Sequence, residues 1–243
     1  MKKNRWYYFV LVFILILIGS FVVWGLTPQS AMPTALEAMK SGMGNSECGC
    51  VAFGSQNSDL TAGFIFYPGG HVDYRAYAPL LKSLAEHGYL AVVVPMPLSL
   101  AVLDLNAAER VVNAFPDIQH WVVGGHSLGG SMAAAYAYSN PDAVEGLVLL
   151  GSYPASSNDL SSNQLHVVSI SAEFDGLTSR EDIVASIPLL PADTRFVEIA
   201  GGNHSQFGWY GNQSGDGLAT ILREDQQRMV VEEIINLLEK TSQ

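Results

Sequence analysis

Charged residues are scarce in this sequence, and positive charge is scarcer still. Only 14% of the 243 residues are charged, with 12 Lys and Arg against 23 Asp and Glu. Lys2, Lys3 and Arg5 precede the first apolar run, so the rest of the chain carries 9 basic and 23 acidic residues, a net charge of −14. Because such an acidic surface repels phosphate groups, we do not expect nucleic acid as a partner.

Cysteine is almost absent as well. The two present, Cys48 and Cys50, are too few for a disulfide framework. A zinc site would need further ligands close by, which this stretch lacks, and a disulfide across a single residue is expected to be strained. The sequence therefore favours two small loop or strand residues, with a redox pair in an exported protein as the alternative. No metal or organic cofactor is predicted.

One long run without any charge lies near the N-terminus. Residues 6–26 form an uncharged stretch of 21 residues, with Trp6 at one end and Trp24 near the other. As a helix this stretch is about 30 Å long, the thickness of a bilayer core, and its aromatic ends suit the membrane interfaces. The alternative is a cleaved signal peptide. Its apolar region is usually shorter, and cleavage after Ala31 would need a small residue where Gln29 stands.

Basic residues before this run set its predicted orientation. They keep residues 1–5 in the cytoplasm, so the folded part lies on the extracytoplasmic side of the cell membrane. The predicted organisation is a single membrane span at residues 6–26, a tether at 27–46 with a short helix at 35–40, and one domain at 47–243.

Beyond residue 60, short apolar runs alternate with helical patterns. With 49% hydrophobic residues, the chain can build a packed core, which excludes intrinsic disorder. Continuous strands rich in β-branched residues, alternating with amphipathic helices, indicate a mostly parallel sheet covered by helices on both faces. The predicted strands are residues 62–67, 89–94, 121–124, 146–150, 166–171 and 195–200, and the predicted helices are 77–87, 107–115, 127–138, 181–187 and 224–238.

A serine lies between one of these strands and an alanine-rich helix. The sequence there is Gly125-His126-Ser127-Leu128-Gly129, a G-x-S-x-G motif. In this context the glycines allow a sharp turn that presents the serine above the sheet, and the following helix favours negative charge at its N-terminus. Serine is also a common helix N-cap. The flanking glycines favour a nucleophile instead.

A nucleophilic serine requires a base, and the base requires an orienting carboxylate. Asp175 follows the strand at residues 166–171, and His204 follows the strand at 195–200. Ends of parallel strands meet at one edge of the sheet, so we expect both side chains near Ser127.

Other carboxylates and histidines fit less well. Asp159 and Glu173 are the alternatives to Asp175, and Glu173 stands short of the sheet edge. His126 adjoins the serine, but we expect it to point away from the site on the sharp turn.

The order Ser127, Asp175, His204 along the chain resembles that of the α/β-hydrolase superfamily. Residues 63–238 look most similar to its small bacterial members without a lid, which are related in architecture to dienelactone hydrolases. The resemblance implies an α/β-hydrolase fold and hydrolysis of an ester-type acyl bond through an acyl-enzyme. It also implies that Ser127 is the nucleophile, His204 the base and Asp175 the acid. Dienelactone hydrolases use a cysteine nucleophile, so their own activity is not implied.

The same resemblance implies an oxyanion hole made of backbone N–H groups. Leu128 would supply one donor, and the loop at residues 68–71 would supply the other, which we assign to Gly70. This loop differs from the HGGG loop that lipases and esterases carry there.

Three side chains are predicted to contact the substrate. His71 lies in the oxyanion loop, Leu98 in an apolar segment after a strand, and Phe207 just beyond His204. Only 15 residues separate the strands at 146–150 and 166–171, too few for a lid domain. The sequence therefore predicts an open site and a small-molecule acyl substrate with a short acyl group. Alternatives are an acyltransferase or a peptidase using the same three residues, or a non-catalytic binding module with this fold.

Overall fold

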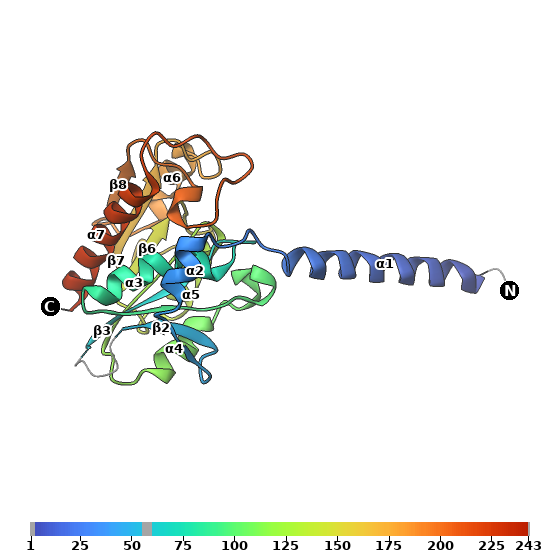
Figure 1. Cartoon of the computed structure of the whole chain (residues 1–243), viewed down its shortest axis with the longest axis horizontal. Helices are drawn as coiled ribbons and strands as arrows, with labels where there is room; N and C mark the ends of the chain where they lie inside the picture. Colours follow the sequence, from blue (N-terminus) through green and yellow to red (C-terminus); the bar gives the residue numbers. More distant parts are fainter. Residues whose placement is uncertain (1–2, 55–59, 243) are drawn as a thin grey trace.

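The computed structural model describes residues 3–54 and 60–242, which form an eight-stranded sheet, flanking helices and one projecting helix (Figure 1). The strand order is β1-β2-β4-β3-β5-β6-β7-β8. All strands from β3 onward are parallel, whereas β1 and β2 pair antiparallel at one edge. The strands are β1 (Met43–Asn45), β2 (Cys50–Phe53), β3 (Ala62–Tyr67), β4 (Leu90–Val93), β5 (His120–His126), β6 (Gly146–Leu150), β7 (His166–Ala172) and β8 (Arg195–Ile199).

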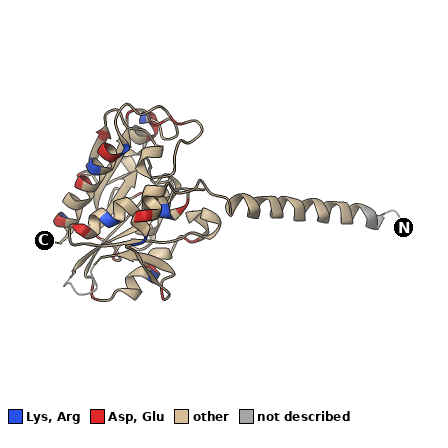
Figure 2. Ribbon diagram, viewed as in Figure 1, with Lys and Arg blue, Asp and Glu red and all other residues tan. Residues whose placement is uncertain are grey.

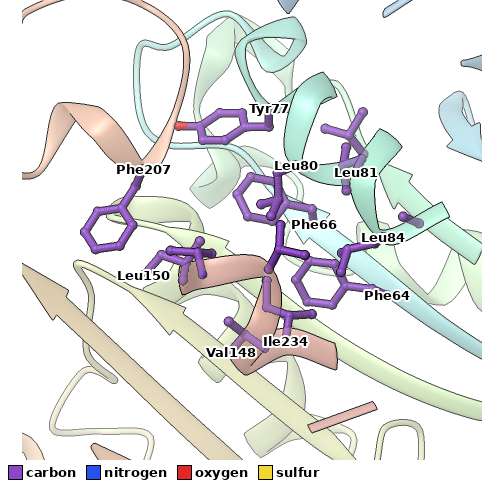
Figure 3. Packing of buried hydrophobic residues seen from close by; sticks show 14 of the residues in the cluster. Phe64, Phe66, Tyr77, Leu80, Leu81, Leu84, Val148, Leu150, Phe207 and Ile234 are labelled. Atoms are coloured by element: carbon purple, nitrogen blue, oxygen red, sulfur yellow. The ribbon is translucent and has the colours of Figure 1, made fainter. Parts of the chain in front are cut away.

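Helices cover both faces of this sheet, as the sequence predicts. Alternate residues of β3 point to opposite faces: Phe64 and Phe66 pack with α2, α3 and α7, and Ile65 and Tyr67 pack with α4 and α5. Figure 3 shows the first of these two cores. The helices are α1 (Lys3–Gly25), α2 (Pro33–Met39), α3 (Ala78–Glu86), α4 (Ala107–Ala114), α5 (Leu128–Ser139), α6 (Arg180–Ser186) and α7 (Arg223–Thr241).

Each strand and helix predicted beyond residue 60 is present, with ends shifted by at most three residues. The antiparallel edge strands β1 and β2 were not predicted. They are only three and four residues long, and β1 carries a glycine and an asparagine, so neither has a periodic pattern to read.

The interpretation of the cysteines as unpaired small residues is wrong. Cys48 and Cys50, the first residue of β2, form a disulfide, with their Cα atoms 5.2 Å apart. Between them, Gly49 has φ +63°, which reverses the chain and brings the two cysteines together. Both side chains are buried.

Much of the segment predicted as a tether packs onto the domain. Helix α2 lies against α3, and its Ala35 is fully buried. Met32 N–H donates to the Trp209 carbonyl at 2.7 Å, and Gln29 N–H donates to the His71 carbonyl at 2.8 Å. From about Gln29 onward, the chain is therefore part of the folded domain.

Helix α1 projects from the domain as a single rod, and its apolar side chains are exposed (Figure 1). Its segment Trp6–Gly25 is long and apolar enough to cross a membrane, a property that signal sequences share. Exposure along its length excludes a core helix of the domain. Residues 1 and 2 of the predicted cytoplasmic end lie outside the described residues.

The packing of α2 can be tested by introducing a charge. We expect Ala35→Asp to lower the free energy of unfolding by about 3 kcal/mol or more, because the carboxylate would be buried without a partner. Leu36→Asp is the matched control, since the neighbouring Leu36 is 39% exposed. Denaturant unfolding measures both. Equal, small effects would mean that residues 33–39 are a loose tether after all.

Candidate active site

Ser127 lies at the sharp turn between β5 and α5, with φ 52° and ψ −124°. This left-handed conformation is strained for a serine and is held by its surroundings. Gly125 and Gly129 flank the turn, and neither position has room for a side chain. A Cβ at Gly125 would lie 2.5 Å from the backbone of Gly129, and one at Gly129 would lie 2.1 Å from the Tyr67 carbonyl oxygen. The turn therefore packs directly on the end of β3.

Asp175 and His204 are brought together from the loops after β7 and β8. Nδ1 of His204 and Oδ2 of Asp175 are 2.8 Å apart, and both side chains are buried. The other carboxylate oxygen accepts hydrogen bonds from the N–H groups of Leu177 and Thr178. With the imidazole proton directed at the carboxylate, Nε2 is free to accept. This buried nitrogen has no partner within the described part of the chain.

A glycine that the sequence did not single out makes room for this pair. Gly151 follows β6 with φ +47°, and a Cβ there would lie 2.9 Å from Asp175 Oδ2 and 3.0 Å from His204 Nδ1. Any side chain at this position would push the two catalytic candidates apart.

The prediction that His126 points away from the site is wrong. Its ring packs against that of His204, with centroids 4.3 Å apart. Gly69 N–H donates to the Tyr77 hydroxyl at 3.1 Å, and the same hydroxyl is hydrogen-bonded to His126 Nδ1 at 2.9 Å. Burial, reinforced by the neighbouring His204, holds the pKa of His126 well below its ordinary value. A neutral imidazole therefore links the oxyanion loop to His204.

Hydrogen bonding in the loop at residues 68–71 leaves one N–H for an oxyanion. Gly69 N–H is taken by Tyr77, and His71 N–H donates to the Ser99 carbonyl at 2.8 Å. Gly70 N–H has no such bond among the described residues. Leu128 is the first residue of α5, so its N–H has no partner within the helix.

These two N–H groups belong to residues in contact. A Cβ at Gly70 would lie 3.0 Å from the side chain of Leu128. The elbow and the loop after β3 therefore bring Gly70 and Leu128 together, as the assignment of both to one oxyanion hole requires.

The three side chains predicted to contact the substrate are engaged elsewhere. His71 stacks on Trp24 of α1, with centroids 4.1 Å apart, and Leu98 lies against Gly25 of the same helix. Phe207 is fully buried, 5.6 Å from the ring of His126. Its large apolar side chain lies near the buried Asp175–His204 pair and helps to exclude water from it.

Asp216 is a further residue that sequence reasoning missed. Its Oδ1 accepts from the N–H groups of His204 and Gly176, and its Oδ2 accepts from that of Ser205. One carboxylate thus joins the loop that carries His204 to the loop that carries Asp175. Asp216 is the sole acid in residues 199–222, the one signal that could have found it.

Comparison with protein families matches residues 63–228 to a family described as the alpha/beta hydrolase family. Because this match covers well over half of the chain and the fold agrees with it, the protein belongs to that family. None of the curated proteins compared with this chain matches it.

Solved structures share the fold at low sequence identity. A predicted CIB-like hydrolase of Thermoplasma acidophilum has 13% identity and a TM-score of 0.58, over 81% of this chain and 98% of that one. Esterase 2 of Thermogutta terrifontis, phosphoramylated by tabun, has 12% identity and a TM-score of 0.58 over 76% and 88%. Est1E of Butyrivibrio proteoclasticus, with bound ferulic acid, has 14% identity and a TM-score of 0.58 over 78% and 95%.

Adding a side chain at Gly151 tests whether the close approach of Asp175 and His204 is needed for activity. We expect Gly151→Ala to lower kcat/KM by about 10- to 100-fold, since small misplacements of catalytic groups have effects of this size. Gly211→Ala is the control, because Gly211 has φ +89° with no atom near the added Cβ. Both changes strain the backbone by about 1 kcal/mol. Equal kinetic losses in the two variants would contradict the crowding argument.

Burial of His126 predicts a pH dependence of stability. Since its folded-state pKa lies below the ordinary value of 6.5, the unfolded chain binds a proton that the folded chain excludes. The contribution to stability is full above pH 6.5 and is lost as pH falls below it, by at most about 1.4 kcal/mol per pH unit.

Denaturant unfolding between pH 7.5 and 5 measures this slope. We expect His126→Gln to flatten it, whereas His87→Gln, at an exposed helix end, leaves it unchanged. An unchanged slope in His126→Gln would show that His126 takes up a proton in the folded protein.

Proposed function

We propose that this alpha/beta hydrolase is a serine esterase that cleaves a carboxylic ester through an acyl-enzyme. The observation that carries the proposal is the buried Asp175–His204 pair, whose Nε2 is left without a partner at the sheet edge where Ser127 stands on its strained turn. Hydrogen bonds between a catalytic serine and its histidine often form fully only when substrate binds.

The steps follow from these positions. Ser127 Oγ attacks the ester carbonyl carbon while its proton passes to His204 Nε2, and Asp175 stabilises the resulting imidazolium. N–H groups of Gly70 and Leu128 stabilise the oxyanion. His204 then gives the proton to the departing alcohol, and water attacks the acyl-enzyme by the same route to release the acid.

Several observations support an ester substrate with a short acyl group. Two of the similar structures are esterases, and one of these is phosphoramylated by tabun, an organophosphorus modification. In this chain, residues 151–165 between β6 and β7 contain turns and no helix, so nothing there forms a lid. An open site can enclose only a short acyl group, which makes a small-molecule ester the proposed partner.

Transfer to another acceptor uses the same residues. An acyltransferase would pass the acyl group to an alcohol, and a peptidase would cleave an amide, so product analysis with water and with an alcohol acceptor distinguishes them. A non-catalytic binding module would fail to react with a fluorophosphonate probe, which labels only an activated serine.

We further propose that α1 is an uncleaved, single-pass anchor in the cell membrane, with the domain on the extracytoplasmic side. Its apolar length supports the span, and the basic residues before it support the orientation. The Cys48–Cys50 disulfide supports an oxidising compartment outside the cytoplasm.

The triad predicts strongly non-additive mutant kinetics. We expect Ser127→Ala and His204→Ala each to lower kcat by at least about 10,000-fold, and the double variant to lose little more, because the residues act as a unit. Asp175→Asn is expected to lower kcat by about 10,000-fold, since the asparagine would hold the wrong imidazole tautomer. Hydrolysis of 4-nitrophenyl acetate measures all of these variants.

Asp159→Asn is the matched control for the acid. Asp159 is exposed and bonds only to Ser161 nearby, so we expect little change in kcat. A severe loss in Asp159→Asn, or losses in the single variants that multiply in the double variant, would contradict the assignment.

A further inference from the structure

The C-terminal end of α1 is seated on the catalytic edge of the domain. His71 Nε2–H donates to the Trp24 carbonyl at 2.8 Å, and the two rings lie nearly parallel, at 5°. Ser99 Oγ donates to the Gly25 carbonyl at 3.3 Å, and a Cβ at Gly25 would lie 2.7 Å from Leu98 Cβ. Thus the loops that border the proposed oxyanion hole also bind the helix end.

The segment that connects α1 to the domain is short, so the helix cannot move far from the domain. Gln29 is already fixed, since its N–H donates to the His71 carbonyl and its carbonyl accepts from Asp73 N–H. Four peptide steps separate Gly25 from Gln29, at most about 14 Å when extended. The catalytic edge therefore stays close to the point where α1 leaves the domain.

The opposite edge of the sheet faces away from α1. Helix α7 ends there, where a Cβ at Gly146 would lie 3.3 Å from Thr241. Figure 1 shows α1 projecting from the side of the domain away from this C-terminus. If α1 spans a bilayer with Trp24 at its interface, as proposed above, the loops around Ser127 lie at the level of the lipid headgroups.

The chemistry of the catalytic edge suits a lipid surface. Residues 95–103 and 151–158 contain no charged side chain, and residues 199–222 contain only Asp216, which is bonded to backbone N–H groups. The loops after β3 and β7 at the same edge do carry charge, with Asp73 paired to Arg75 and with an exposed Glu173. Charged residues are frequent along helices such as α3 and α7 (Figure 2). Large apolar side chains are exposed in this region, namely Leu26, Val102, Leu103, Leu218 and Leu222, at 51% to 84%.

Electrostatics leave few other faces that could approach a bilayer. The chain beyond Arg5 has a net charge of −14, and anionic headgroups repel such a domain. Loops with few charged side chains and with exposed leucines reduce this repulsion and gain from burying apolar surface.

We propose that the catalytic edge docks on the bilayer that α1 spans, and that the substrate is an amphiphilic ester held in this bilayer. The inference rests on the proposed esterase function and anchor. The open site takes the short acyl group onto Ser127, and the apolar alcohol leaves with a proton from His204 and stays in the lipid. Water then releases the short acid from the acyl-enzyme.

Depth of insertion tests the docking directly. The full chain is placed in phosphatidylcholine vesicles with a bimane label on Leu103→Cys or on Tyr138→Cys. Tyr138 is 45% exposed near the end of α5, at the opposite edge, and Cys48 and Cys50 are already bonded to each other. We expect brominated phosphatidylcholine to quench the label at 103 at least threefold more than the label at 138. Equal quenching, or failure of the chain to stay with the vesicles, would overturn the docking.

Kinetics test the substrate class. We expect Leu103→Asp to lower the rate on vesicle-held hexadecyl acetate, relative to 4-nitrophenyl acetate in water, by about tenfold, and Tyr138→Asp to leave this ratio unchanged. If Leu103→Asp leaves the ratio of the two rates unchanged, the proposed substrate class is wrong. Hydrolysis of the soluble ester that depends on Ser127 would in that case still support the esterase function. Loss of both hydrolysis and fluorophosphonate labelling in the unaltered chain would instead overturn the proposed function, and the quenching would still decide the docking.

Discussion

The catalytic edge depends on the close approach of the turn after β5 to the end of β3. Gly129 lies so near the Tyr67 carbonyl oxygen that a Cβ would stand 2.1 Å from it. This contact forces Ser127 into a left-handed conformation at the tip of the turn and brings Leu128 against Gly70. One constraint therefore positions both the proposed nucleophile and the two proposed oxyanion donors, because all three lie within a few residues of it.

Sequence alone predicted the central sheet and the three catalytic candidates for one physical reason. The inner parallel strands are buried on both faces and are rich in apolar residues, and Ser127 and Asp175 lie at or just beyond the ends of two of them, β5 and β7. His204 follows the last strand, β8, by five residues. Strands β1 and β2 escaped prediction because, at three and four residues, they are too short to show a periodic pattern. Pairing of Cys48 with Cys50 escaped it because it depends on the turn at Gly49, which spacing does not reveal.

Residues that support the site were missed because their roles arise from contacts between distant loops. His126 meets His204 only once β5 and the loop after β8 are assembled, and its direction depends on the twist of the turn beside it. Asp216 acts through backbone N–H groups, so its being the sole acid in residues 199–222 does not by itself reveal what it binds. Tyr77 is hidden in the same way, since its hydroxyl links Gly69 to His126 from within the core. Together they hold the oxyanion loop and the base in one buried network.

The distribution of the few charged residues in this chain can be related to the proposed membrane anchor. An acidic domain tied to a membrane would ordinarily swing away from anionic lipid, yet the bonds of His71, Gln29 and Ser99 to the end of α1 and the chain beyond it fix its orientation. With the orientation fixed, charge on the catalytic edge would have to lose its hydration against the bilayer, which is unfavourable. If the catalytic edge docks on the bilayer as proposed, the lack of charge in residues 95–103 and 151–158 therefore lowers the cost of bringing this edge to the lipid.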